Sequence, residues 1–163
     1  MPTGSCEGSY RDIGHRRCRL YRRKFHEARV NNRPAVTVWG TGTPRREFLY
    51  SDDMADACVF LMGLPEAQFD TLLGSDEQAT GMFMPPLVNI GVGVDLTIRE
   101  LAESVKRAVG YDGEIVFDSD KPDGTPRKLM DVSRLNHLGW VAKTGMAEGL
   151  AKAYGDFLER HRS

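Results

Sequence analysis

Cysteine is scarce in this sequence: its 163 residues include only Cys6, Cys18 and Cys58. Three widely spaced cysteines exclude a disulfide lattice and a paired-cysteine zinc site, and they favour a reducing cytoplasm. Cys58 lies in an apolar stretch, so we expect it in the core. Long hydrophobic runs are missing too, since none approaches the roughly 20 residues that span a bilayer, and no secretory leader is visible. We therefore expect a protein without a membrane partner.

The sequence also lacks ready-made nucleotide-binding and catalytic motifs. It contains no GxxxxGK[ST] phosphate loop, and the turn Gly91-Val92-Gly93 has Leu96 where a dinucleotide-binding turn needs its third glycine. No Ser/His/Asp or Cys/His set stands out, and the four histidines lie in polar surroundings. We therefore expect no catalytic residue, no metal site and no self-contained dinucleotide site in this chain.

Charge is nearly balanced overall, with a formal net charge of −1, but it is unevenly distributed. Residues 1–35 are strongly basic, whereas the remaining residues are acidic. A basic arm on an acidic body suggests a small nucleic-acid-binding module as one alternative, and a structural module without a ligand is another. The arm has few interleaved aromatics and matches no nucleic-acid-binding motif, which favours no nucleic-acid partner.

Hydrophobic periodicity and turn residues predict alternating helices and strands in one domain. Residues 4–20 show no hydrophobic period, so we expect a loop or disorder there. Thr97 and Glu100 predict a capping box at the start of a helix that ends at Gly110. The pattern predicts helices over 21–30, 51–63, 97–109 and from 144, a short helix over 67–73, and strands over 35–39, 46–50, 87–90 and 114–118. This alternation predicts an α/β fold with a small mixed sheet and packed helices. The apolar face of helix 51–63 is expected to comprise Met54, Ala57, Cys58, Leu61 and Met62.

Two polar loops carry unusual chemistry. Residues 39–48 place Trp39 at a strand end ahead of glycines and two arginines; Trp offers a stacking face, and Arg offers a fork that suits phosphate oxygens. Residues 121–128 contain two prolines that stiffen the backbone around Asp123, Arg127 and Lys128, and a fixed carboxylate can accept donors from a base or a ribose diol. Together the loops indicate a pocket for a nucleotide diphosphate. The alternative is a pair of solvated loops with Trp39 in the core.

Three longer stretches carry a more specific signal. They are VWGTGTPRREFLYSDDMADA, VNIGVGVDLTIRELAESVKRAVGYDGEIVFD and SDKPDGTPRKLMDVSRLNHLGW. From about Arg23 to the C-terminus, the sequence resembles the C-terminal half of the GDP-L-fucose synthase family within the extended short-chain dehydrogenase/reductases. The motifs WGTGxPxREF and KPDGTPRK are the most distinctive part of this resemblance.

The resemblance implies the substrate-binding C-terminal domain of such an enzyme, with the Rossmann half absent. It implies GDP-sugar contacts at Lys24, Trp39, Arg46, Asp123 and Lys128, although Lys24 could equally be a solvated helix lysine. Pro2 and Thr3 resemble the start of a family segment beside the NADP nicotinamide. The family epimerises and reduces GDP-4-keto-6-deoxymannose with NADPH and forms homodimers.

The departures from the family are as informative. The family's glycine-rich NADP turn, catalytic Ser, Tyr-x-x-x-Lys pair and catalytic Cys have no counterpart here. The resemblance therefore implies a fragment that supplies the GDP-sugar pocket, is inactive alone and does not bind NADP alone. Residues 4–23 do not follow the family pattern. We accordingly interpret residues 1–22 as an atypical basic segment, disordered or translated out of frame, and residues 23–163 as the GDP-sugar-binding domain.

Overall fold

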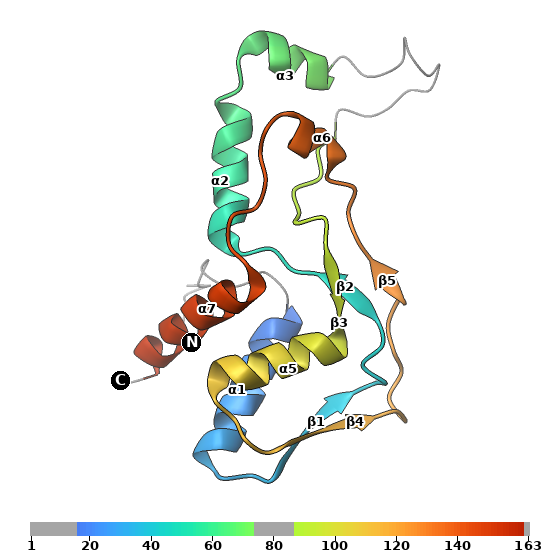
Figure 1. Ribbon diagram of the computed structural model, residues 1–163, viewed down its shortest axis with the longest axis vertical. Coiled ribbons are helices and arrows are strands. Elements are labelled where there is room, and N and C mark those ends of the chain that lie inside the picture. Colours follow the sequence, from blue (N-terminus) through green and yellow to red (C-terminus); the bar gives the residue numbers. More distant parts are fainter. Residues whose placement is uncertain (1–15, 74–86, 162–163) are drawn as a thin grey trace, which may run out of the picture.

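The computed structural model describes residues 16–73 and 87–161. Its elements follow the chain in this order: α1 (Arg16–Val30), β1 (Ala35–Trp39), β2 (Arg45–Glu47), α2 (Ser51–Met62), α3 (Glu66–Leu73), β3 (Asp95–Thr97), α5 (Ile98–Val109), β4 (Glu114–Asp118), β5 (Arg127–Lys128), α6 (Ser133–His137) and α7 (Met146–Arg160). Figure 1 shows α1, α5 and the β1–β4 pair at one end of an elongated molecule, and α2, α3 and α6 at the other, with the remaining strands between them. Pro2, Thr3 and Cys6 lie outside the described residues.

The strands form two small sheets. β1 and β4 pair in parallel, from Ala35 opposite Glu114 to Trp39 opposite Asp118. β2 lies between β3, which it meets antiparallel, and β5, which it meets in parallel. The arrangement confirms the predicted α/β fold with a small mixed sheet, and β1 and β4 have the predicted bounds.

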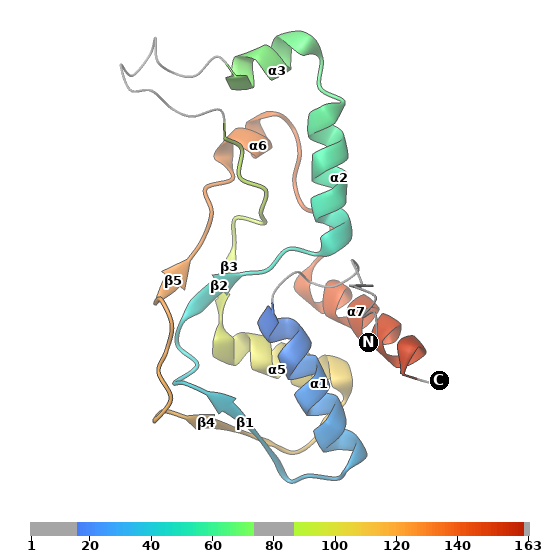
Figure 2. The same cartoon turned by 180° about the vertical axis from the view of Figure 1, so that it is seen from behind.

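The main core lies where α1, α5 and α7 pack together beside β1 (Figure 2). Phe25, Val38 and Leu101 are completely buried there. The Thr97–Glu100 capping box forms as predicted, and Gly110 ends α5 in the left-handed conformation (φ 69°). A smaller cluster around Leu135 and Trp140 holds α6 against α2.

Helix α1 begins earlier than the sequence predicts. Residues 16–20, for which we expected a loop or disorder, form its first turn. Cys18 and Tyr21 are buried and continue the three-to-four-residue spacing of Phe25 and Ala28 along one helix face. Residues 18–22 therefore form part of a packed helix, and the out-of-frame origin of residues 4–23 stays a prediction. Residues 1–15 lie outside the described part of the chain.

The basic residues of α1 contact their own protein. Arg22 donates to the Ala153 carbonyl (3.0 Å), and Arg29 donates to the Val109 carbonyl (2.6 Å), so both fasten neighbouring helices. Arg23 pairs with Glu27 one turn later (2.7 Å). The positive charge of α1 is thus partly committed to intramolecular packing.

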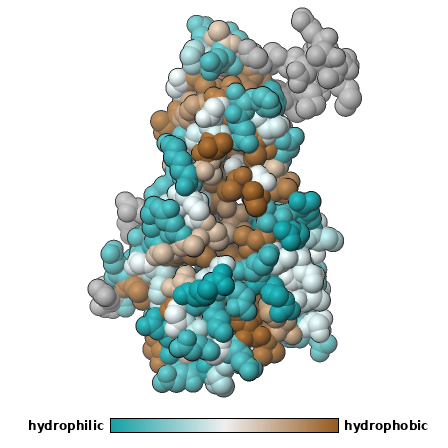
Figure 3. All heavy atoms as spheres, viewed as in Figure 1, coloured by the Kyte–Doolittle hydropathy of each residue, from teal (hydrophilic) through white to brown (hydrophobic). Residues whose placement is uncertain are grey.

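The predicted inward face of α2 is confirmed only at Ala57 and Leu61, which belong to or pack on the cluster around Trp140, and is wrong at its other three residues. Only Asp53 and Ala57 of this helix are buried, whereas Cys58 is exposed and Met54 and Met62 are 46% and 77% exposed. The reason is polar: the Asp53 carboxylate accepts hydrogen bonds from the Thr144 backbone (2.8 Å) and hydroxyl (3.0 Å). These bonds hold the Asp53–Ala57 face inward, whereas Met54, Cys58 and Met62 face outward. Figure 3 shows hydrophobic side chains at the surface in the upper half of the view, the end that holds α2, α3 and α6 in Figure 1.

The predicted strand over 87–90 is also wrong, since these residues form no ladder within the described structure. A strand needs a neighbour to accept its backbone hydrogen bonds, and none of the described strands lies beside this segment. Val88 and Ile90 instead pack onto the cluster around Trp140. No helix in the described ranges is long and apolar enough to cross a membrane.

Candidate functional site

The predicted site residues Trp39 and Lys24 lie together at the end of β1. Trp39 is 65% exposed, so it is not a core residue. The Lys24 ammonium, from α1, and the Lys121 ammonium, from the loop after β4, each lie 5.9 Å from the centroid of the Trp39 ring. Lys24 also donates to the Thr37 carbonyl (3.3 Å), which ties it to the same strand as Trp39. These distances allow cation–π attraction, so the ring is held beside positive charge.

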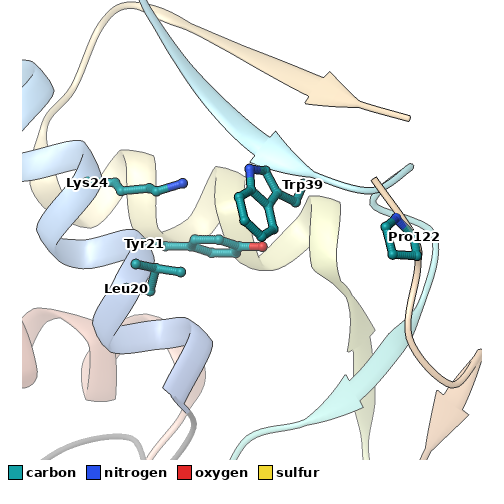
Figure 4. A pocket seen from close by; sticks show the side chains of 5 residues that line it. All are labelled: Leu20, Tyr21, Lys24, Trp39 and Pro122. Carbon is teal, nitrogen blue, oxygen red and sulfur yellow. The ribbon is translucent and has the colours of Figure 1, made fainter. Parts of the chain in front are cut away.

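A cavity of about 290 Å³ opens beside this tryptophan. Leu20, Tyr21, Lys24, Trp39 and Pro122 line it (Figure 4). Lys24 extends from α1 toward the Trp39 indole, and the Tyr21 ring lies across the space below it. Sequence analysis missed Leu20, Tyr21 and Pro122. For Tyr21 the available signal was its position one helical turn before Lys24, which places both side chains on the same face.

The third predicted site residue, Asp123, holds the two polar loops together. Its carboxylate accepts hydrogen bonds from the Thr41 backbone (3.0 Å) and hydroxyl (2.6 Å). A Cβ on Gly40, whose φ is +87°, would lie 2.2 Å from an Asp123 carboxylate oxygen. Only glycine therefore permits this approach. Asp123 thus positions the loop that follows Trp39. It is the neighbour in sequence of Pro122, which lines the cavity.

Arg46 and Lys128 are brought together by strand pairing. They are opposite each other in the parallel ladder of β2 and β5. Arg46 is 6% exposed, and among the described residues its guanidinium donates only to the Arg45 carbonyl (2.6 Å). Lys128 is exposed. The two polar loops, residues 39–48 and 121–128, are paired by a hydrogen bond from the Arg45 N–H to the Pro126 carbonyl (2.7 Å). These paired loops connect the two cations to the Trp39 cavity.

The two neighbouring arginines share one carboxylate, which was not predicted from the sequence. Arg45 and Arg127 donate to the two oxygens of Asp95, at 2.8 and 2.5 Å. Hydrogen bonds from Arg127 and Arg45 lower the pKa of Asp95 below its ordinary value, so this carboxylate stays charged. Because one carboxylate offsets only one of the two guanidinium charges, this group stays net positive beside Arg46 and Lys128.

Glu47 closes the turn Gly91-Val92-Gly93. One carboxylate oxygen accepts from the Val92 and Gly93 N–H groups, the latter at 2.7 Å, and the other accepts from the Met130 N–H (3.0 Å). A Cβ on Gly91 would lie 2.4 Å from the Glu47 carboxylate. The glycines of this turn thus allow the Glu47 carboxylate to approach the backbone. The Val92 and Gly93 N–H groups, which could otherwise bind a phosphate, already donate to this carboxylate. No group of three His, Cys, Asp or Glu residues within the described ranges could hold a metal ion.

Comparison with known proteins agrees with this geometry. The model of the NAD dependent epimerase/dehydratase family matches residues 5–71. A putative GDP-L-fucose synthase 2 from Arabidopsis thaliana is 50% identical over 137 residues, which cover 84% of this chain and 37% of that protein. The GDP-L-fucose synthase of Escherichia coli K12 is also 50% identical over 137 residues, covering 40% of its length. This chain is thus similar to the NAD dependent epimerase/dehydratase family over residues 5–71 and to GDP-L-fucose synthases over most of its length.

A solved structure supports the fold. The GDP-mannoheptose C4 reductase MlghC from Campylobacter jejuni, with NADP bound, superposes with a TM-score of 0.71 at 33% identity, over 88% of this chain and 45% of that one. The resemblance to GDP-L-fucose synthases and the expected fold class are both confirmed. The chain spans about two fifths of the length of the curated relatives it matches.

Proposed function

We propose that this chain forms the GDP-sugar-binding part of a GDP-L-fucose synthase, whose reaction epimerises and reduces GDP-4-keto-6-deoxymannose. The observation that carries the proposal is the cavity at Trp39, which joins an exposed stacking face to positive charge. Apolar cavities with a few oriented polar groups are the usual form of small-ligand sites. The similarity to GDP-L-fucose synthases supports the choice of a GDP-sugar as ligand.

Within this proposal each predicted residue has a distinct task. Trp39 stacks on the guanine base, and Lys24 contacts the same part of the ligand. Arg46 and Lys128 attract the diphosphate, because Arg46 is nearly buried and forms no ion pair within the described structure. Asp123 acts through Thr41 and keeps the loop of Trp39 in position.

The residues present do not fit NADP, the cofactor of the related synthases. The sequence has no glycine-rich dinucleotide turn, and in the turn at residues 91–93 the Val92 and Gly93 N–H groups are bonded to Glu47. The chain's own residues therefore bind and orient the GDP-sugar, and we assign no step of hydride transfer to them. By the family resemblance, the proposal extends to a cytoplasmic homodimer.

Calorimetric titration of the full chain with GDP tests the proposal. We expect weak binding, with a Kd in the micromolar to millimolar range, because the chain spans only part of the synthase scaffold. Arg46→Ala should weaken binding by about tenfold, the usual loss for one charged hydrogen-bonding partner. Arg107→Ala is the matched control, since Arg107 is exposed and donates to Ser104 on the same helix. Equal affinities for wild type and Arg46→Ala would remove Arg46 from the site.

A further inference from the structure

The loop of residues 40–44 joins the two parts of the proposed site. It leaves β1 after Trp39 and enters β2, which carries Arg46. In the proposed function Trp39 stacks on the base and Arg46 attracts the diphosphate, so the path of this loop sets the spacing between the two ends of the site. The loop contains no helix or strand of its own. Its path must therefore be fixed by contacts with other elements.

The N-terminus of α5 holds this loop through the backbone. The Ile98 N–H donates to the Pro44 carbonyl and the Arg99 N–H donates to the Gly42 carbonyl, each at 2.9 Å. These N–H groups belong to the first turn of α5, where the helix itself offers them no acceptor. Gly42 and Pro44 are both buried. The helix and the loop thus hold each other in place.

The Arg99 side chain adds a further contact with the same loop. Its Nη2 donates to the Thr41 carbonyl (3.2 Å). Its guanidinium carbon lies 3.8 Å from the centroid of the Phe117 ring, a distance at which a cation and an aromatic ring attract each other. Phe117 is opposite Val38 in the β1–β4 ladder, so the supporting ring belongs to the sheet that leads to Trp39. The guanidinium, although exposed, is therefore held in one place.

Gly42 allows Arg99 and Phe117 to approach the loop. Its φ is +81°, and an added Cβ would lie 2.5 Å from Phe117 Cε1 and 3.2 Å from Arg99 Cβ. Beside it, Thr41 is held from two sides, since its N–H donates to Asp123 (3.0 Å) and its carbonyl accepts from Arg99. Two side chains of opposite charge, from α5 and from the loop after β4, thus fix the same residue.

The position of Arg99 gives it a task within the proposed function, on which this inference rests. We propose that Arg99 is a positioning residue: it sets the spacing between Trp39 and Arg46, so that one GDP-sugar contacts both at once. A ligand that reaches both groups gains from the preset spacing, because the loop need not be ordered on binding. A ligand that reaches only one of them gains nothing from it. A general loss of stability would not produce this difference.

The experiment compares GDP with two ligands that each reach one end of the site. Inosine offers a purine base to Trp39 and has no phosphate, whereas inorganic pyrophosphate offers negative charge to Arg46 and has no base. NMR titration of the full chain measures the Kd of each, including millimolar values. We expect Arg99→Leu to weaken GDP binding by about tenfold and to change inosine and pyrophosphate binding by less than about twofold.

Two further variants separate positioning from charge. Arg99→Lys keeps the positive charge but lacks the planar guanidinium, so it should weaken GDP binding as Arg99→Leu does. Arg107→Leu removes another exposed arginine from α5 and is the matched control, which should bind all three ligands as wild type does. Circular dichroism confirms that each variant is folded.

Hydrogen exchange of the free chain gives a readout that needs no ligand. The Thr41 N–H should exchange about tenfold faster in Arg99→Leu, because the loop then opens more often. The Gly110 N–H, which donates to the Arg107 carbonyl at the other end of α5, should be unchanged. Unchanged exchange at Thr41 would overturn the positioning role.

Each other result of the titrations decides against the proposal. Weakening of pyrophosphate in proportion to GDP would show that Arg99 contacts the diphosphate itself. Weakening of inosine in the same proportion would show a collapse of the surface at Trp39. Unchanged GDP binding in Arg99→Leu would overturn the task of Arg99 and leave the proposed function standing. Failure of wild type to bind GDP would overturn the proposed function, and with it the task of Arg99, even if exchange at Thr41 responds as expected.

Discussion

Carboxylates in this molecule mainly hold backbone in place. Asp123 accepts from the Thr41 N–H, Glu47 from those of Val92 and Gly93, and Asp53 from that of Thr144. Such bonds are stronger than neutral ones because the acceptor is charged. A few single residues therefore determine the shape of the loops around the site. Substitutions that disturb these residues should lower the affinity for the ligand.

Gly40→Ala tests this dependence. The added Cβ would lie 2.2 Å from an Asp123 oxygen and would have to adopt a φ of +87°, so the paired loops must separate. We expect the free energy of unfolding to fall by about 1–2 kcal/mol and the affinity for GDP to fall by about tenfold. Urea unfolding and calorimetry measure the two effects.

Gly139→Ala is the control for backbone strain alone. Gly139 has a similar φ of +96°, but nothing lies within 4 Å of its added Cβ, and it follows α6 away from the Trp39 cavity. This variant should lose stability and keep its GDP affinity. A loss of affinity equal to that of Gly40→Ala would contradict the role of the Asp123 contact.

His26 should make stability depend on pH. Its ring lies 2.9 Å from the Tyr154 hydroxyl and 5.0 Å from the Phe157 ring centroid. Burial, and then the positive charges of Arg29 and His161, lower the pKa of His26 below its ordinary 6.5. The folded state therefore disfavours the protonated ring, so its contribution to stability is complete above pH 6.5 and declines as the pH falls toward the lowered pKa.

Thermal unfolding between about pH 7.5 and pH 5.5 measures this effect. Wild type should lose Tm over the acidic half of that interval, and His26→Gln should show a smaller loss because the titrating ring is gone. His137→Gln, at an exposed position on α6, is the control and should follow wild type. Parallel curves for wild type and His26→Gln would rule out His26 as the source.

At the scale of elements, β1, β4 and α5 were predictable because their signals are local: β-branched runs bounded by turn residues, and a capping box followed by helical apolar spacing. The full inward face of α2 was not predictable, because a polar contact between Asp53 and Thr144, 91 residues away in the sequence, helps to orient this helix. The segment 87–90 has a strand-like composition, but a strand also requires a partner in space, which composition does not reveal.

The capping box of α5 should contribute measurably to the free energy of unfolding. The Thr97 hydroxyl accepts from the Glu100 N–H (3.1 Å), and the Glu100 carboxylate accepts from the Thr97 N–H (2.7 Å). Thr97→Ala should lower the free energy of unfolding by about 1 kcal/mol, as for other N-caps. Urea unfolding measures the change. Ser104→Ala, at a partly exposed position inside the same helix, should be neutral or slightly stabilising, so an equal loss there would contradict a capping role.

At the scale of the whole molecule, the predicted site residues separate into two groups joined by paired loops. Trp39 belongs to the distinctive motif WGTGxPxREF, Lys24 was implied only by the family resemblance, and the structure places the two side chains together. The aromatic wall at Tyr21 was missed because three of the five residues at 16–20 are arginines, so this stretch suggests a loop. That wall emerges only when α1 is seen to pack against β1, so the cavity is a property of the fold.

The last prediction concerns catalysis by the chain alone. The Val92 and Gly93 N–H groups are bonded to Glu47, and the sequence contains no glycine-rich dinucleotide turn or Tyr-x-x-x-Lys pair. Without them no hydride donor is positioned and no proton is delivered to the sugar. We therefore expect the purified chain to consume no NADPH with GDP-4-keto-6-deoxymannose, even at concentrations at which GDP binds. The absorbance of NADPH reports the reaction, with the Escherichia coli GDP-L-fucose synthase as the positive control. Sustained NADPH consumption by the purified chain would show that residues outside the family's known catalytic set can support the reduction.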